Sequence, residues 1–87
     1  MARVLLVTGG SRGIGAAICR LGARDGYDVA INYAGHADAA EAVAADVRKQ
    51  GRRAVTIQAD VRDPAAVAAM FDRAAKELGY VAAFVSN

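Results

Sequence analysis

The sequence predicts an α/β fold in which a doubly wound parallel sheet is covered by helices on both faces. Short apolar runs alternate with helix-length amphipathic segments along all 87 residues, and the runs are almost continuously apolar. A glycine-rich turn joins the first run to the first helix, which is typical of a Rossmann fold. Right-handed crossovers give the strand order 3-2-1-4, so the chain reverses direction between its first and fourth strands.

The first half of the chain is predicted to fold as strand, helix, strand and helix. Residues 3–7 are a short apolar run that ends at glycine, which favours a buried strand. Apolar side chains recur at helical spacing over residues 14–25, and residues 27–33 form the next strand. Asp38 and Glu41 have the pattern of a capping box, which predicts the start of the second helix.

The second half repeats this alternation. Gly51 ends the second helix, and residues 54–59 carry the β-branched side chains that favour a strand. Asp63 and Pro64 supply an N-cap and a first-turn proline for the third helix. Residues 81–86 are a last apolar strand, which we expect to lie at an exposed edge of the sheet.

Composition and charge restrict the class of protein. Apolar residues make up 55% of the sequence, and eleven basic residues oppose nine acidic ones without a long basic run, so neither disorder nor nucleic-acid binding is predicted. No apolar stretch reaches the roughly 18 residues of a membrane span, and the first run is too short for a signal peptide. The single cysteine, Cys19, fits a reducing compartment, so we expect a cytoplasmic protein.

The glycine-rich turn is the most informative segment: Thr8-Gly9-Gly10-Ser11-Arg12-Gly13-Ile14-Gly15. Gly9 is expected to permit a tight turn, Gly13 to let the backbone approach a pyrophosphate, and Gly15 to let the helix pack closely. The amino end of the helix adds free N–H groups and positive potential. This predicts a dinucleotide site at the carboxyl ends of the strands; the alternative is a glycine-rich turn without a ligand.

The end of the second strand bears on the choice of dinucleotide. NAD-specific Rossmann sites place a carboxylate there, but residues 31–34 read Ile-Asn-Tyr-Ala. Arg12 offers a fixed positive charge for a 2′-phosphate, so NADP is favoured over NAD, although a solvated loop arginine is the alternative. Tyr33 is expected either to stack on the adenine or to be a half-buried strand-end residue. His36 is expected to be a surface loop residue, with an approach to the 2′-phosphate as the alternative. Arg52 and Arg53 are expected to remain solvated at the opposite end of the sheet.

The glycine spacing G-x-x-x-G-x-G resembles the cofactor motif of the short-chain dehydrogenase/reductase family, and the loop is most similar to that of 3-oxoacyl carrier-protein reductases. Asp60-Val61, after the third strand, extends the resemblance. So does Val85-Ser86-Asn87, where the family carries Asn-Asn-Ala-Gly and this chain has Ser86 in place of the first asparagine.

The resemblance implies roles for particular residues. Ser11, Arg12 and Ile14 would contact the phosphates and ribose of the cofactor. Asp60 and Val61 would receive the adenine, since a carboxylate at a strand end accepts hydrogen bonds from an exocyclic amine; an ordinary loop acid is the alternative. Asn87 would lie under the nicotinamide ribose.

The residues that perform the chemistry are missing from the sequence. Hydride transfer to a carbonyl needs a proton donor, which in the resembling family is a Tyr-x-x-x-Lys pair with a serine. No tyrosine here is followed by lysine at that spacing, so we name no catalytic residue, and no metal site is predicted. We expect residues 1–87 to be the dinucleotide-binding half of a domain, truncated after the fourth strand and inactive alone.

The intact parent is then expected to be an NADP-preferring, homo-oligomeric oxidoreductase that acts on a small-molecule carbonyl or alcohol. A non-catalytic nucleotide-binding module is the alternative. A fragment that docks a partner through its last strand is a third interpretation.

Overall fold

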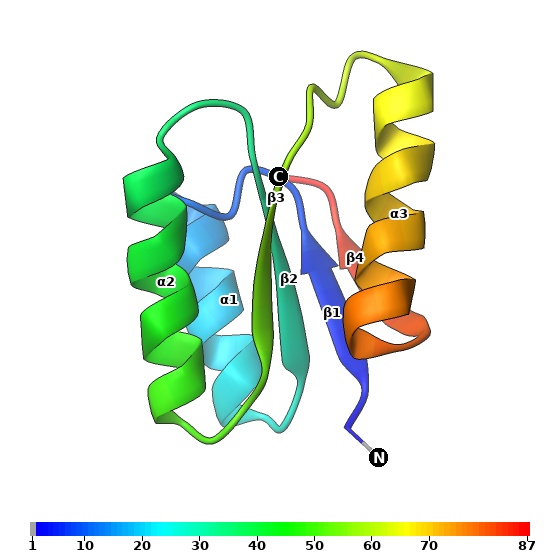
Figure 1. Ribbon diagram of the computed structural model, residues 1–87. Helices are drawn as coiled ribbons and strands as arrows, with labels where there is room; N and C mark the ends of the chain where they lie inside the picture. Colours follow the sequence, from blue (N-terminus) through cyan, green and yellow to red (C-terminus); the bar gives the residue numbers. More distant parts are fainter. Residues whose placement is uncertain (1) are drawn as a thin grey trace.

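The computed structural model describes residues 2–87, which form a sheet between two layers of helices (Figure 1). The sheet is parallel and has the strand order β3-β2-β1-β4, which confirms the predicted fold and topology. Among these residues, no helix is both long and apolar enough to cross a bilayer. The elements follow in the order β1 (Val4–Val7), α1 (Gly13–Arg24), β2 (Asp28–Tyr33), α2 (Ala37–Lys49), β3 (Ala54–Gln58), α3 (Pro64–Leu78) and β4 (Val81–Val85).

Each face of the sheet has its own apolar core. α1 and α2 cover one face, where Val7, Ile31 and Val43 are buried, and α3 covers the other, where Leu6 and Met70 are buried. Because helices lie on both faces, all four side chains of β1 are buried. This accounts for the continuous apolar run in the sequence.

α3 begins where the sequence predicts. The carboxylate of Asp63 accepts a hydrogen bond from the backbone N–H of Ala65 (3.0 Å), and Pro64 occupies the first turn. Gly79 follows the helix with a φ of 113°, a conformation that favours glycine. The predicted N-cap and first-turn proline are confirmed.

α2 begins differently from the prediction. Its first residue is Ala37, and its N-cap is His36, which has a φ of 43° in the left-handed region and makes no side-chain capping bond. Asp38 lies within the first turn, and the carboxylate of Glu41 accepts a hydrogen bond from the Thr56 hydroxyl (2.7 Å). The predicted capping box is wrong, because Glu41 faces β3 and finds its partner there.

β3 and β4 are the edges of the sheet, as expected for the last strand. β4 pairs with β1, and the register shifts between Val4 and Leu5. Phe84 is 46% exposed, and its ring lies against that of Phe71 with 5.2 Å between centroids. The last strand therefore leaves apolar surface in contact with solvent.

Arginine side chains close the amino end of the sheet. Asp28 is buried at the start of β2, and its carboxylate accepts hydrogen bonds from the backbone N–H (2.9 Å) and the Nε (3.1 Å) of Arg53. Arg53 also donates to the carbonyl of Leu78 (2.8 Å), and Arg52 donates to that of Gly26 (3.0 Å). Both arginines keep contact with solvent, as expected, since the Arg53 side chain is 62% exposed and Arg52 is partly exposed. Their hydrogen bonds were not predicted and arise because helix carboxyl ends gather here and present carbonyls that need donors.

Candidate functional site

The glycine-rich turn lies at the carboxyl end of the sheet, between β1 and α1 (Figure 1). Gly9 and Gly13 have φ values of 61° and 58°, in the left-handed region that favours glycine. A Cβ atom on Gly15 would overlap the carbonyl oxygen of Gly9. The turn therefore requires glycine at all three positions, at two for backbone conformation and at the third for space.

β2 and α1 hold the first half of the turn. The backbone N–H of Gly10 donates to the carbonyl of Asn32 (2.9 Å), and the N–H of Gly9 donates to the Asn32 side-chain oxygen (3.2 Å). A Cβ on Gly10 would lie only 3.0 Å from the sulfur of Cys19 and from Cγ2 of Ile31. Burial raises the pKa of the Cys19 thiol to about 12, so the thiol stays protonated at neutral pH and serves as packing.

The second half of the turn leads into the amino end of α1. The N–H of Ala16 donates to the carbonyl of Arg12 (3.3 Å), which is the first hydrogen bond of the helix. The N–H groups of residues 13–15 precede that bond and are the donors that a helix leaves unpaired at its amino end. Together with the helix dipole and the exposed side chain of Arg12, they form a region of positive potential suited to an anion.

An open cavity of about 640 Å³ lies at this end of the sheet. Its volume is in the range of about 300–1,000 Å³ that is common for small-molecule sites. The cavity contains four of the predicted site residues, namely Gly9, Asp60, Val61 and Asn87. The full lining comes from the ends of all four strands and the loops that follow: Thr8, Gly9, Asn32, Ala34, Gln58, Ala59, Asp60, Val61, Arg62 and Asn87.

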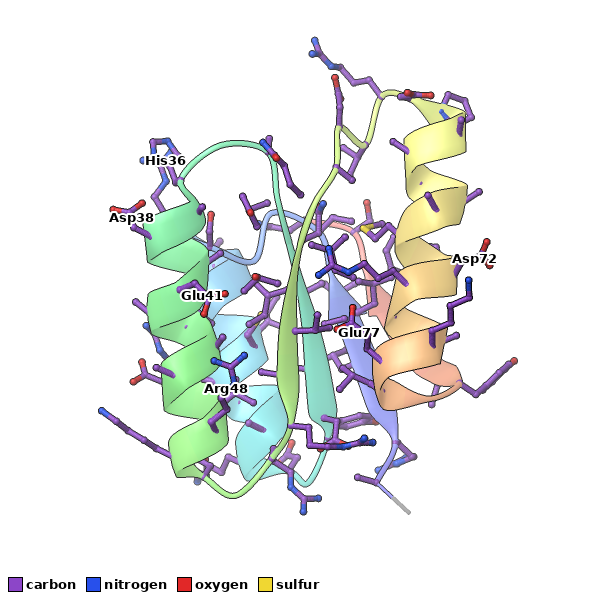
Figure 2. The ribbon with its side chains drawn as sticks, viewed as in Figure 1. His36, Asp38, Glu41, Arg48, Asp72 and Glu77 are labelled. Atoms are coloured by element: carbon purple, nitrogen blue, oxygen red, sulfur yellow. The ribbon has the colours of Figure 1, made fainter. Side chains whose placement is uncertain are left out.

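The remaining predicted residues lie outside the cavity lining: Ser11, Arg12, Gly13, Ile14, Gly15 and Tyr33. Ile14 is 73% exposed in the first turn of α1. Tyr33 is half-buried against the core beneath α1 and α2, which matches the strand-end interpretation of this residue. His36 lies exposed at the amino end of α2, close to Asp38 (Figure 2).

Asp60 is paired with Arg62 at the mouth of the cavity. One carboxylate oxygen accepts from the backbone N–H (2.9 Å) and Nε (3.1 Å) of Arg62, and the other accepts from Nη2 (2.9 Å). These side-chain hydrogen bonds lower the pKa of the Asp60 carboxyl below its usual 3.8, so the carboxylate is ionised at neutral pH. It retains lone pairs for a further donor. Sequence reasoning missed Arg62, although a loop aspartate commonly accepts a hydrogen bond from the backbone N–H two residues further on.

The residues after β4 are tied to the glycine-rich turn. The backbone N–H of Asn87 donates to the hydroxyl oxygen of Thr8 (3.0 Å), and its side-chain Nδ2 donates to the carbonyl of Gly9 (3.2 Å). The Thr8 hydroxyl in turn donates to the carbonyl of Val85 (3.4 Å). Asn87 therefore occupies a fixed place beside the turn. Within residues 2–87, no cluster of three or more His, Cys, Asp or Glu side chains is arranged to hold a metal ion.

Comparison with known sequences identifies the family. The sequence model of the short chain dehydrogenase family matches residues 3–87. The chain belongs to this family. This membership confirms the resemblance that the glycine spacing indicated.

Two relatives illustrate the extent of the match. The chain is 45% identical over 85 residues to the versicolorin reductase stcU of Emericella nidulans, covering 98% of this chain and 32% of that protein. It is 41% identical over 87 residues to the 3-oxoacyl-[acyl-carrier-protein] reductase FabG of Staphylococcus aureus, covering 100% of this chain and 35% of that protein. The chain thus spans about a third of the length of these relatives.

Solved structures of other short-chain dehydrogenases have the same fold. A short-chain dehydrogenase/reductase from Serratia marcescens matches with a TM-score of 0.93 and 44% identity, over 98% of this chain and 35% of that one. A short chain dehydrogenase from Burkholderia cenocepacia, in complex with NADP, matches with a TM-score of 0.89 and 49% identity, over 95% of this chain and 34% of that one.

Besides Arg62, two further residues at the site were not predicted from the sequence. Thr8 gave no local signal, since a small polar residue beside glycines is ordinary in a turn. For Asn32, the sequence indicated only that no carboxylate stands at this position. Its side chain nevertheless contacts both the glycine-rich turn and the end of β3.

Proposed function

We propose that residues 1–87 form the part of a nicotinamide dinucleotide site that binds the adenosine and diphosphate, within a longer oxidoreductase. The parent enzyme would transfer a hydride between NADP(H) and a carbonyl or alcohol. The observation that carries this proposal is the glycine-rich turn at the amino end of α1, placed beside a cavity at the carboxyl ends of the strands. Family membership and the NADP complex of a matching structure support it.

The diphosphate is assigned to the turn. Gly9 and Gly13 take left-handed conformations there, and no side chain at these positions blocks access to the backbone. The N–H groups of residues 13–15 point along the helix axis toward the space that the phosphates would fill. Ser11 and Ile14 flank this space.

The adenosine and the nicotinamide ribose are assigned to the two sides of the cavity. Asp60 and Val61 would receive the adenine, with the ionised Asp60 accepting a hydrogen bond from the exocyclic amine. Asn87, fixed by Thr8 and Gly9, would lie under the nicotinamide ribose. The bound cofactor supplies the hydride, while residues 1–87 bind and orient it.

The preference for NADP rests on the charges around the end of β2. Residues 31–34 include no carboxylate that could bind a ribose 2′-hydroxyl, and Asn32 is buried. Arg12 is exposed at the start of α1 and carries a permanent positive charge. We assign recognition of the 2′-phosphate to Arg12.

Catalytic residues are not assigned within residues 1–87. The proton donor that hydride transfer requires would come from the part of the enzyme that this chain does not contain. The matched relatives carry names that refer to different substrates, so the substrate class is proposed only as a carbonyl or alcohol.

Replacement of Arg12 by alanine in the complete gene product tests the proposal. We expect the Kd for NADPH to rise about ten- to hundredfold, the equivalent of a charge-assisted hydrogen bond of about 1.5–3 kcal/mol, while the Kd for NADH changes little. Cofactor fluorescence measures both constants. Arg24→Ala, at the other end of α1 and also exposed, is the matched control. An equal loss of affinity for both cofactors would exclude Arg12 as the selecting residue, and no binding of either by the unmodified protein would refute the proposed function.

A further inference from the structure

Asn32 holds an unusual position at the end of β2. Its residue is only 2% exposed, yet its side chain makes three hydrogen bonds to two different segments. The side-chain oxygen accepts from the N–H of Gly9 (3.2 Å), and Nδ2 donates to the carbonyls of Ile57 (3.3 Å) and Ala59 (3.2 Å). One buried amide thus connects the glycine-rich turn to the end of β3.

The orientation of this amide is determined by its partners. The NH₂ group of the Asn32 side chain has two hydrogens, and it donates both of them to backbone carbonyl oxygens. A carbonyl oxygen can only accept hydrogen bonds, so these two positions require the NH₂ group. The opposite orientation would place the side-chain oxygen against the carbonyls of Ile57 and Ala59 and the NH₂ against the N–H of Gly9. The side chain therefore has no donor left for a ligand.

The partners of Asn32 lie next to the groups assigned to the cofactor. Gly9 has a left-handed φ, and its carbonyl lies so close to Gly15 that a displaced Gly9 would move the amino end of α1. Ala59 directly precedes Asp60. The backbone carbonyl of Asn32 adds a bond from the N–H of Gly10 (2.9 Å).

We propose that Asn32 is a positioning residue that sets the glycine-rich turn at a fixed separation from the adenine-binding loop and takes no part in reading the 2′ position. This inference rests on the proposed function. Diphosphate and adenine are common to NADP and NAD, so Asn32 contributes to the binding of both to the same extent. The choice between them is made by solvent-exposed side chains such as that of Arg12.

This assignment differs from what the sequence suggests, because a carboxylate at the end of β2 is the usual sign of NAD specificity. Asp at position 32 would point at the carbonyls of Ile57 and Ala59, where a carboxylate has no donor to accept from, and it would not reach a ribose. Ala34 is exposed and lines the cavity. A carboxylate at position 34 would face the ligand instead.

The test measures Kd values for NADPH and NADH by cofactor fluorescence in the complete gene product. For Asn32→Ala, we expect both constants to rise about tenfold with their ratio unchanged, the effect of about one lost hydrogen bond on each. Asn32→Asp keeps an acceptor for Gly9 and loses both donors, so it should weaken both cofactors without creating a preference for NADH. Ala34→Asp should change the ratio in favour of NADH.

A control separates positioning from general destabilisation. Arg53→Ala removes hydrogen bonds at the opposite end of the sheet and should leave both Kd values unchanged. In a ¹⁵N–¹H spectrum, Asn32→Ala should move the amide proton of Gly9 upfield, since that N–H loses its acceptor, whereas Arg53→Ala should not.

Three results would overturn the inference: unchanged Kd values in Asn32→Ala, a changed NADPH to NADH ratio in that variant, or a preference for NADH in Asn32→Asp. If Asn32→Ala does not fold, Asn32→Asp decides the question by the same ratio. Failure of the proposed function is distinct, since the unmodified protein would then bind neither cofactor.

Discussion

The two ends of the sheet differ in where their polar groups find partners. At the amino end, the buried carboxylate of Asp28 and the carbonyls of Gly26 and Leu78 all receive hydrogen bonds from Arg52 or Arg53. At the carboxyl end, the N–H groups of residues 13–15 precede the first hydrogen bond of α1. These polar groups at the amino end are paired within the protein, whereas the amino end of α1 presents donors to a ligand.

The direction of the helices explains this difference. In a parallel α/β fold the helices run opposite to the strands, so their carboxyl ends gather at the amino end of the sheet (Figure 1). Negative potential and unpaired carbonyls there attract guanidinium groups. Positive potential and unpaired N–H groups at the other end attract an anion. The same architecture thus produces a binding site at one end of the sheet and, at the other, a set of structural hydrogen bonds from Arg52 and Arg53, called here the arginine clasp.

Glycine substitutions at the two ends should have the largest contrasting effects. Gly15→Ala places a Cβ on the carbonyl of Gly9, so we expect a loss of about 3 kcal/mol in the free energy of unfolding from overpacking. The Kd for NADPH should rise more than about a hundredfold, the equivalent of about 3 kcal/mol. Chemical denaturation and cofactor titration measure the two quantities.

Gly26→Ala is the matched substitution at the amino end. Gly26 has a φ of 95° but open space around its Cβ position, so only backbone strain of about 1 kcal/mol is expected. Cofactor affinity should be unaffected. A binding defect as large as that of Gly15→Ala would mean that the two ends are not independent.

Removal of Arg53 should affect stability alone. Arg53→Ala leaves the buried carboxylate of Asp28 without its ion pair, and we expect the free energy of unfolding to fall by about 1–2 kcal/mol, a figure reduced because the Arg53 side chain is 62% exposed. The double variant with Asp28→Asn should recover part of this loss. Thermal and chemical denaturation provide the measurements. If the effects of Arg53→Ala and Asp28→Asn on the free energy of unfolding were strictly additive, the two residues would not be coupled, which would contradict the arginine clasp.

The smallest expected effect concerns Asp60 at the binding end. Hydrogen bonds from Arg62 lower the pKa of this carboxyl, so the ionised form is kept above the lowered pKa and is lost as the pH falls through it. In Arg62→Ala the pKa should rise toward 3.8. Carboxyl ¹³C shifts recorded across acidic pH report the midpoint. Arg48→Ala, which loses an exposed pair with Glu41, should leave the Asp60 titration unchanged.

Local signals in the sequence predicted most of the fold. β1 and β2 were predictable because strands buried on both faces appear as apolar runs in the sequence. The start of α3 was predictable because its N-cap, Asp63, and Pro64 act on the residues next to them. The start of α2 could not, because Glu41 is engaged by Thr56, fifteen residues away in the sequence. Side-chain pairing across elements decided that boundary.

The site was predicted unevenly for the same reason. The backbone conformation of the turn requires glycine at particular positions, so the spacing of the glycines in the sequence was enough to locate the turn. The role of Asn32 depends on partners 23 to 27 residues distant, and that of Arg53 on an aspartate 25 residues away. Strand alternation does place Asn32 on the opposite face from Tyr33, but it does not reveal what an inward amide would bind.

The most direct test of the central claim is a ¹⁵N–¹H titration of the complete gene product with NADPH. Hydrogen bonds from residues 13–15 to a diphosphate should move their amide protons downfield, while the amides of Arg52, Arg53 and Gly79 at the opposite end should stay in place. Shifts confined to the amino end of the sheet, or binding without change at residues 13–15, would contradict the assignment of the diphosphate to the glycine-rich turn.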